Sequence, residues 1–171
     1  FKKIHLASRR LESCKKVQKE TVSKIDISQV DADDVEATVK LIEKVKPDLV
    51  INTGDNFGHP DALEAIQHAL APFAGTPGVY VHGSNDYFGP EFKNPFGYFG
   101  GPSGRTTRAS TLDTAGLERY LDNGLGWLGL NNAAHALELR GSRLEFFGVN
   151  DAHRGWDRLD PGGRAASVAA H

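Results

Sequence analysis

The sequence contains no methionine, not even at position 1, and only one cysteine, Cys14. A single cysteine excludes an internal disulfide framework and suits a reducing compartment, so we expect a cytoplasmic protein. Because an open reading frame starts with methionine, we also expect residues to be missing at one or both ends. No stretch approaches the roughly 20 apolar residues that a membrane-spanning helix requires, and no signal peptide is recognisable.

An excess of positive charge is also lacking. The chain has 20 basic and 22 acidic residues and a formal net charge of -2 at pH 7. Without a basic footprint, nucleic acid is not an expected partner. Hydrophobic residues make up 39% of the 171 residues and charged residues 25%, which is ordinary for a soluble globular domain. We therefore expect one domain over residues 1–171, and the sequence does not indicate an oligomeric state.

Strand and helix patterns alternate along the middle of the chain and predict an α/β fold. Residues 31–47, "DADDVEATVKLIEKVKP", carry apolar residues at helical spacing, with acids at the start and lysines at the end. Apolar runs predict strands at 48–53 and 78–82, and a helix within 59–73 joins them. A strand–helix–strand unit of this length predicts two adjacent parallel strands with a right-handed crossover.

Less regular segments surround this unit. We expect a strand within residues 1–7, a helix at 112–124 and a hairpin turned at 140–142. The second hairpin strand, at 144–149, is expected to join the same sheet as the strands at 48–53 and 78–82. Residues 89–111 are rich in glycine, proline and aromatic residues, which predicts a flexible loop over the strand ends.

Three apolar strands are followed directly by Asn or Asp, in "VINTGDN", "VYVHGSND" and "FFGVND". The carboxyl ends of parallel strands meet at one edge of a sheet, where ligands bind in open α/β folds. We therefore expect Asp55, Asn85 and Asn150 at the same edge. Oxygen-rich side chains suit hard or borderline cations, although Asp and Asn are also common in turns.

The segments "PDLVINTGDN" and "VYVHGSNDY" resemble the second and third motifs of the calcineurin-like metallophosphoesterases, in the bacterial branch that has Gly-Ser-Asn-Asp-Tyr. This resemblance implies a metallophosphoesterase-type α/β sandwich, apparently incomplete at its C-terminus. It also implies two divalent metal ions, Mn, Fe or Zn, that activate a hydroxide to hydrolyse a small phosphomonoester or phosphodiester substrate.

The resemblance assigns roles to residues near the strand ends. Asp55 takes the place of the carboxylate that bridges the two metal ions, and Asn85 or Ser84 completes one metal site. Asn85 and Asp86 stand in the catalytic part of the third motif. Asn56, directly after Asp55, is expected to contact substrate.

The other ligand positions match in more than one way. His5 in "KKIHLAS" takes the first-motif histidine position, with Lys3 where an aspartate is expected. An alignment on "HLAS" instead places Ser8 and Arg10 at the two ligand positions. His171 would be the histidine that ends the fourth-motif strand.

Two arginines in the long loop, Arg105 and Arg108, could reach a substrate phosphate, because a guanidinium matches phosphate geometry. The closing Gly-His-x-His motif is absent, so we expect one weakly held metal ion or none, and weak or no activity. His82 lacks ligand spacing, so a surface or packing role is expected, although its position one residue before Gly83 could bring it near the site. Two alternatives stay open: a non-catalytic metallophosphoesterase-like binding module and, more distantly, a doubly wound nucleotide-binding domain.

Overall fold

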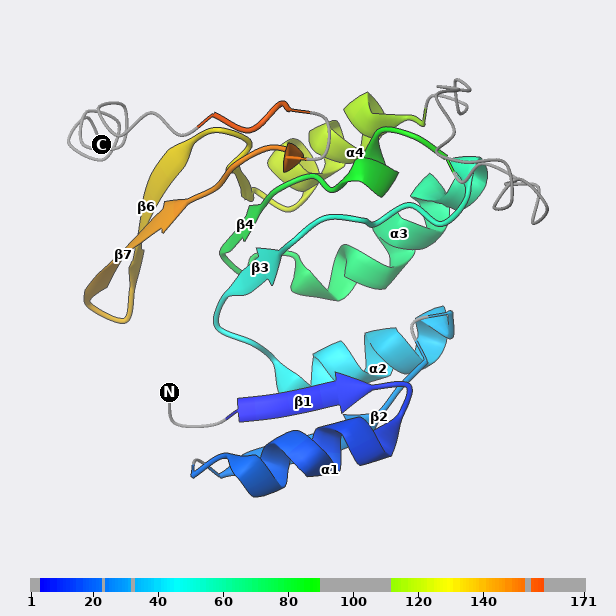
Figure 1. The fold of residues 1–171 in the computed structure, drawn as a ribbon, viewed down its shortest axis with the longest axis vertical. Coiled ribbons are helices and arrows are strands. Elements are labelled where there is room, and N and C mark those ends of the chain that lie inside the picture. The colour runs from blue at the N-terminus through cyan, green and yellow to red at the C-terminus, as the bar shows by residue number, and fades with distance from the viewer. Residues whose placement is uncertain (1–3, 23, 32, 90–111, 153–154, 159–171) are drawn as a thin grey trace, which may run out of the picture.

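The computed structural model describes residues 4–22, 24–31, 33–89, 112–152 and 155–158. It has an α/β fold, as predicted (Figure 1). In chain order the elements are β1 (Ile4–Ser8), α1 (Leu11–Glu20), β2 (Ile25–Gln29), α2 (Val35–Val45), β3 (Val50–Asn52), η1 (Pro60–Ala62), α3 (Leu63–Leu70), η2 (Ala71–Phe73), β4 (Gly78–Tyr80), η3 (Ser84–Asp86), α4 (Thr114–Arg119), the π-helical turn η5 (Tyr120–Gly124), β5 (Leu128–Gly129), β6 (Ala134–Leu139) and β7 (Ser142–Phe147).

The strands of the described residues form three small sheets. Strands β1 and β2 pair in parallel, β3, β4 and β5 form a parallel sheet in that order, and β6 pairs with β7 in antiparallel orientation. The adjacent parallel pair predicted at 48–53 and 78–82 is therefore confirmed as β3 and β4. In Figure 1, α2 lies between the β1–β2 pair and the β3–β4–β5 sheet with its helices.

The hairpin strand predicted at 144–149 does form, as β7, but the prediction that it joins the sheet of β3 and β4 is wrong. Its partner is β6, and Leu139 faces Ser142 across the turn. The two turn residues, Arg140 and Gly141, have φ angles of 51° and 77°, which matches the twist of a tight hairpin. The hydrogen bonds of β7 are thus made locally, with its sequence neighbour.

Helix α2 shows why the predicted helix over 31–47 is shorter in the structure. Asp34 caps its start, and the Asp34 side-chain oxygen accepts a hydrogen bond from the Ala37 amide at 2.9 Å. Lys46 ends the helix in the left-handed conformation, with φ of 48°, immediately before Pro47. Helix α2 packs against α3 and η2, whereas α1 packs against β1 and β2.

The main hydrophobic core lies between the β3–β4–β5 sheet and the helices α3 and α4 with η5. Leu117 and Leu121 are completely buried there, together with Trp127, whose indole Nε1 donates to the Thr76 carbonyl at 3.1 Å. Among the described residues before β3, only Cys14 and Ile25 are buried. Within the described ranges, the segment before β3 therefore has far fewer buried apolar side chains than the segment from β3 onward.

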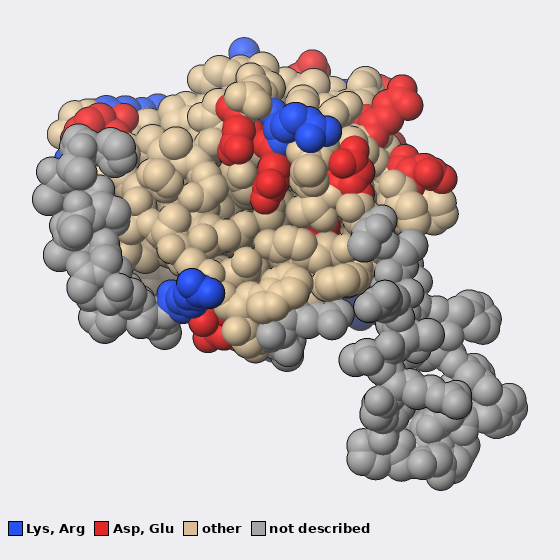
Figure 2. All heavy atoms as spheres, turned by 90° about the horizontal axis from the view of Figure 1, so that it is seen from above, with Lys and Arg blue, Asp and Glu red and all other residues tan. Residues whose placement is uncertain are grey.

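Within the described ranges, no helix has both the length and the apolar character needed to cross a membrane. Seen from above, the surface is mostly uncharged, and most of its acidic side chains gather towards the upper right of the view (Figure 2). That face therefore presents no basic surface for a polyanion. The flexible loop predicted at 89–111 lies outside the described residues except for Gly89, and the single domain over 1–171 stays a prediction.

Candidate functional site

A tight turn, Asn52–Asn56, follows β3 at its carboxyl end. Gly54 and Asp55 both have left-handed backbone conformations, with φ of 86° and 59°. The Asn52 side-chain Oδ1 accepts a hydrogen bond from the Gly54 amide at 2.9 Å, which is the usual way an asparagine stabilises a turn. The Gly-Asp pair is thus explained locally, because glycine and aspartate both tolerate this conformation.

A second turn, at the end of β4, packs directly on the first. A methyl group added at Gly54 would lie 2.2 Å from the Gly83 backbone nitrogen. The Asn85 amide donates to Asp55 Oδ1 at 3.0 Å. Glycine at position 54 is therefore required both for its φ angle and for the close approach of the two backbones.

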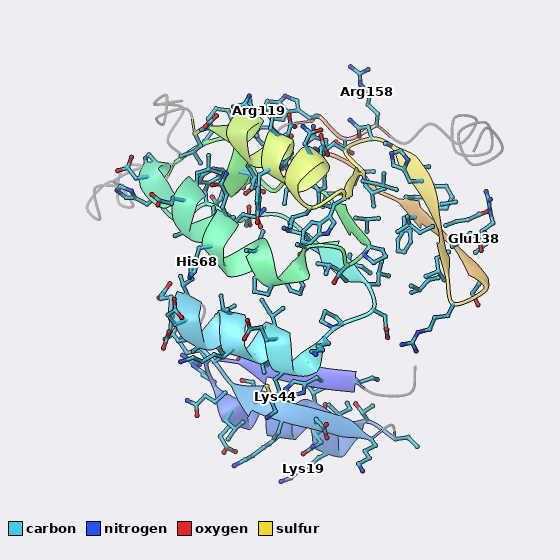
Figure 3. All side chains as sticks on the ribbon, turned by 180° about the vertical axis from the view of Figure 1, so that it is seen from behind. Lys19, Lys44, His68, Arg119, Glu138 and Arg158 are labelled. Atoms are coloured by element: carbon cyan, nitrogen blue, oxygen red, sulfur yellow. The ribbon has the colours of Figure 1, made fainter. Side chains whose placement is uncertain are left out.

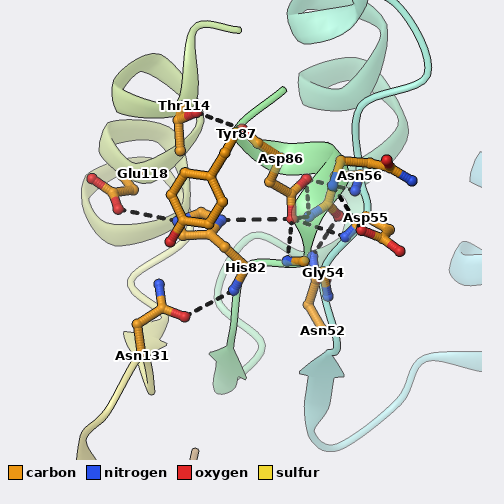
Figure 4. A network of polar contacts seen from close by, with 12 residues as sticks. Asn52, Gly54, Asp55, Asn56, His82, Asp86, Tyr87, Thr114, Glu118 and Asn131 are labelled. Atoms are coloured by element: carbon orange, nitrogen blue, oxygen red, sulfur yellow. Dashed lines mark hydrogen bonds and ion pairs between the residues drawn. The ribbon is translucent and has the colours of Figure 1, made fainter. Parts of the chain in front are cut away.

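The carboxylate of Asp86 holds the two turns together (Figure 4). Asp86 is completely buried. Its Oδ2 accepts from the amides of Asp55 at 2.8 Å and Gly83 at 3.0 Å, and its Oδ1 accepts from the amide of Asn56 at 2.6 Å. The Asn56 side chain donates to both oxygens, at 3.2 and 3.3 Å. A buried carboxylate with this many donors is a positioning group for the surrounding backbone.

Burial by itself raises the pKa of Asp86, but the His82 ring, 3.7 Å away, and hydrogen bonds from Gly83 and Asn56 outweigh it, so the pKa lies below its ordinary value. A carboxyl whose pKa is lower in the folded than in the unfolded state stabilises the fold at high pH. That stabilisation is complete above the unfolded value, near 3.8, and is lost as the pH falls through the lower folded value.

We therefore expect the difference in unfolding free energy between wild type and Asp86→Asn to shrink on acidification. Equilibrium urea unfolding measured near neutral pH and again below 3.8 checks this. A difference that stays constant across that range would show that Asp86 is not ionised in the folded protein.

The structure brings some of the predicted site residues together. Asp55 and Asn85 lie side by side at one edge, as predicted, and both are exposed. Asn150 reaches the same region, because the Tyr87 hydroxyl donates to Asn150 Oδ1 at 3.1 Å. The Asn56 side-chain nitrogen donates to Asp86, and the Asn56 Oδ1 accepts a hydrogen bond from the Asn52 side chain at 2.8 Å.

Other predicted residues do not join this group. His5 lies on β1, in a different sheet, where its Nε2 is 2.9 Å from Ser28 Oγ. Lys3, Arg105, Arg108 and His171 lie outside the described residues. Among the residues that are described, no three His, Cys, Asp or Glu side chains are grouped closely enough to hold a metal ion.

Two members of the network were not recognised from the sequence as belonging together. His82 is buried and its Nε2 lies 3.1 Å from Glu118 Oε1, on α4. The backbone amide of His82 donates to Asn131 Oδ1 at 3.0 Å. A histidine inside an apolar strand was the available signal, but nothing in the sequence indicated Glu118 as its partner, 36 residues away.

A separate polar turn follows β1 and leads into α1. Ser8, Arg9 and Arg10 lie at the carboxyl end of the parallel strand, and both arginines are exposed. No side chain caps the start of α1. The first amides of a helix lack intrahelical partners and carry partial positive charge. This turn therefore combines three features that favour an anion: two exposed arginines, the carboxyl end of a parallel strand and the uncapped start of a helix.

A Gly-x-Gly-x-x-Gly pattern occurs at residues 124–129, "GLGWLG". The dinucleotide-binding fingerprint requires this pattern to follow a strand and to open a helix. Here its first glycine ends η5 and its last glycine lies in β5, so the order is reversed. Residues 1–76 contain glycine only at positions 54, 58 and 75 and have no such pattern.

Comparison with known proteins relates the first part of the chain to a nucleotide-dependent enzyme family. A family model described as the saccharopine dehydrogenase NADP binding domain matches residues 1–76. The chain is 38% identical over 82 residues to a carboxynorspermidine synthase of Vibrio cholerae serotype O1, covering 43% of this chain and 20% of the relative. The corresponding enzyme of Vibrio alginolyticus is 34% identical over 82 residues, with the same coverage. The chain therefore spans about a fifth of the length of these curated relatives.

These matches overturn the metallophosphoesterase interpretation. The matched segment includes the Gly-Asp pair that had indicated a metal-bridging carboxylate, and the family it matches binds NADP. The prediction of a phosphoester hydrolase, active or inactive, is therefore wrong, and so is the alternative of a non-catalytic phosphoesterase-like module. The prediction of a cofactor pair of Mn, Fe or Zn ions is wrong for the same reason.

The metal-binding roles given to Asp55, Asn85, His5 and His171 lose their basis with this correction, as do the phosphoester contacts given to Asn56, Arg105 and Arg108. The α/β class stands, but the sandwich of the phosphoesterase type does not. Of the alternatives raised from the sequence, the doubly wound nucleotide-binding domain agrees with what residues 1–76 are similar to.

Proposed function

We propose that residues 1–76 form part of a Rossmann-like NADP-binding domain of an oxidoreductase. The enzyme would be of the kind represented by saccharopine dehydrogenase and carboxynorspermidine synthase, acting on a small-molecule substrate. The observation that carries this proposal is the turn from β1 to α1, which lies inside the matched segment and presents Ser8, Arg9 and Arg10. When bound, NADP supplies or accepts a hydride.

The parallel pairing of β1 with β2 supports this proposal. The two strands are in register from Ile4 with Ile25 to Ser8 with Gln29, and α1 connects them. In doubly wound folds, ligands bind outside the carboxyl ends of such strands. The turn at Arg9 and Arg10 lies at that end.

The chemistry of the turn suits the phosphate that distinguishes NADP from NAD. An arginine near the end of a Rossmann strand accommodates the 2′-phosphate of the adenosine ribose. A guanidinium can donate two parallel hydrogen bonds to phosphate oxygens, and its charge is independent of pH in the working range. The uncapped amides at the start of α1 add further donors on the same side.

Hydrogen bonds fix the backbone of this turn. The Val30 amide donates to the Ser8 carbonyl at 3.2 Å, and the Gln29 side chain donates to the Arg9 carbonyl at 3.1 Å. The Arg10 amide donates to Ser8 Oγ at 3.3 Å. The hydrogen bonds from Gln29 and Val30, at the end of β2, thus fix the backbone of Ser8 and Arg9. The bond between Arg10 and Ser8 fixes the backbone that carries the second arginine. The residues present fit the adenosine 2′-phosphate, whereas residues 1–76 offer no glycine-rich loop for the pyrophosphate.

The test uses adenosine 2′,5′-bisphosphate, which carries the 2′-phosphate, and AMP, which lacks it. We expect the whole chain to bind the bisphosphate more tightly than AMP in isothermal titration calorimetry. The double variant Arg9→Ala/Arg10→Ala should lose about 10- to 100-fold in affinity for the bisphosphate, the equivalent of about 1.5–3 kcal/mol for charge-assisted hydrogen bonds, and should bind AMP unchanged.

Arg119→Ala is the matched control, because Arg119 is an exposed arginine on α4, far from this turn in Figure 3. Its affinity for the bisphosphate should equal that of the wild type. Equal binding of the bisphosphate and AMP by the wild type, or an unchanged affinity in the double variant, would refute the proposed role of this turn.

The sequence also led to predictions about the cellular location and the number of domains. A cytoplasmic location stays a prediction, supported by the presence of a single cysteine. A single domain over residues 1–171 is likewise proposed, with α2 lying between the β1–β2 pair and the core of residues 50–127.

A further inference from the structure

Strand β1 has one edge beside which no other strand lies. Within the described ranges, β1 pairs only with β2, in parallel. The Ser8 carbonyl accepts a hydrogen bond from the Val30 amide at 3.2 Å, so the backbone groups of Ser8 face β2. Because successive residues of a strand face opposite edges, His5 and Ala7 direct their backbone groups to the edge without a strand.

Strand β3 has an edge of the same kind. The Val50 amide donates to the Pro77 carbonyl at 2.9 Å, and the Asn52 carbonyl accepts from the Val81 amide at 3.0 Å, so both residues face β4. Ile51, between them, directs its N–H and C=O to the other edge, where the described residues contain no strand. Two parallel edges of the same chain therefore offer hydrogen-bonding groups to a further strand.

The side chain of Ile51 is also more exposed than expected for a strand of an α/β fold. Val50 packs against the core formed with α3 and α4, and neighbouring side chains of a strand point to opposite faces. Ile51 therefore points away from α3 and α4, and it is 59% exposed. The face of the sheet opposite α3 and α4 thus lacks a cover at β3.

The helices already lie where one continuous sheet requires them. In the order β2-β1-β3-β4, right-handed crossovers place α1 on one face and α2 together with α3 on the other. In the structure α1 packs against β1 and β2, and α2 packs against α3. Helix α2 has an apolar side that includes Ile42 and Val45, but none of its residues is buried. Only the pairing of β1 with β3 is missing from this arrangement.

We propose that β1 pairs with β3 and closes one parallel sheet in the order β2-β1-β3-β4-β5. In Figure 1, α2 lies between the two sheets that would join. The β1–β2 pair and α1 move as one unit, turning about the connection between Gln29 and Val35, while α2 keeps its contact with α3. Closure covers Ile51, because the face to which it points is the face that carries α1.

Closure also completes a ligand site, and this step rests on the proposed function. In the closed order the chain leaves β1 and β3 towards opposite faces, which forms the crevice where doubly wound domains bind ligands. The turn with Arg9 and Arg10 then lies on one side of the crevice, and the Asn52–Asn56 turn lies on the other. A nucleotide that contacts both turns favours the closed sheet, because it binds that state more tightly.

The test measures hydrogen exchange of single backbone amides by NMR in the whole chain, with and without adenosine 2′,5′-bisphosphate. We expect the ligand to slow exchange at Ile51 and at His5 or Ala7 by about tenfold or more, because these amides gain carbonyl partners. The amides of Leu6 and Ser8 already face β2, so they report any general stabilisation and should slow less.

Two variants at position 51 separate strand pairing from folding. Proline is tolerated on an edge strand, but it lacks the N–H that a central strand needs. Ile51→Pro should therefore weaken binding of the bisphosphate about tenfold, the effect of one lost hydrogen bond. Ile51→Thr is the matched control, because it keeps the N–H and the branched side chain, and it should bind within about threefold of the wild type. Tryptophan fluorescence checks that both variants are folded.

Three results decide the outcome. Fast exchange at Ile51 with the ligand bound, or equal binding by Ile51→Pro and the wild type, would overturn the closed sheet. Slowed exchange at Ile51 alone, increasing with protein concentration, would also overturn it, because a second copy would then occupy the edge of β3. Slow exchange at both edges in a chain that does not bind the bisphosphate would support the closed sheet and reject the proposed function.

Discussion

Replacing Asp86 with alanine is expected to lower the free energy of unfolding by about 3–5 kcal/mol. The substitution removes the acceptor of three backbone amides, those of Asp55, Asn56 and Gly83. Each buried donor left without a partner costs about 1–3 kcal/mol. It also leaves the ring of His82 without the carboxylate at its Nδ1 side. The two turns would then lose the side chain that accepts hydrogen bonds from both, and keep the bond from the Asn85 amide to Asp55 Oδ1.

The measurement is equilibrium unfolding in urea, followed by tryptophan fluorescence, to which the buried Trp127 and the exposed Trp156 both contribute. Asp33→Ala is the control, because Asp33 is exposed, and its substitution should change the unfolding free energy by less than about 0.5 kcal/mol. Asp86→Asn retains the shape of the side chain but loses the charge and one acceptor oxygen, so it should fall between alanine and the wild type. A loss below about 1 kcal/mol in Asp86→Ala would show that water replaces the carboxylate at little cost.

Replacing Gly54 with alanine should destabilise the protein by about 2–5 kcal/mol. A side chain at a φ of 86° is strained by about 1–2 kcal/mol. The added methyl group would also lie 2.2 Å from the Gly83 nitrogen and 2.7 Å from the His82 carbonyl carbon. These contacts are backbone atoms that cannot rotate away, and overpacking of this kind costs about 1–3 kcal/mol.

The variant Gly75→Ala separates the cost of the backbone conformation from the cost of the close contacts. Its φ is 80°, close to that of Gly54, but an added methyl group there would meet nothing within 4 Å. Gly75→Ala should therefore cost only the conformational part, about 1–2 kcal/mol. Equal losses in the two alanine variants, measured by urea unfolding, would show that the close approach of the Gly54 and Gly83 backbones has no energetic weight.

The misassigned family shows how a short motif can follow from local geometry. Gly54 and Asp55 are needed to turn the chain with positive φ angles after β3. Asp86 is needed to bond the amides of that turn. Glycine, asparagine and aspartate at strand ends therefore arise from turn formation, and their order in the sequence does not distinguish this role from metal binding.

Much of the secondary structure followed from the sequence alone, because its causes are local. The apolar spacing, the cap at Asp34 and the proline after Lys46 determined α2. The apolar runs around Val50 and Val79, joined through one helix, determined a parallel pair with a common carboxyl edge. Arg140 and Gly141 determined the hairpin of β6 and β7. Propensity, periodicity and turn chemistry act over a few residues and can be read along the chain.

The partners of the polar side chains were decided only by the tertiary structure. His82 meets Glu118 across 36 positions, and Asp86 meets the amides of Asp55 and Asn56 across about 30. The placement of β7 beside β6, away from β3 and β4, is of the same kind. Such contacts depend on how separate elements pack, and burial then decides whether a carboxylate faces water or holds a turn. No local pattern contains that information, because the spacing between the partners is set by the fold.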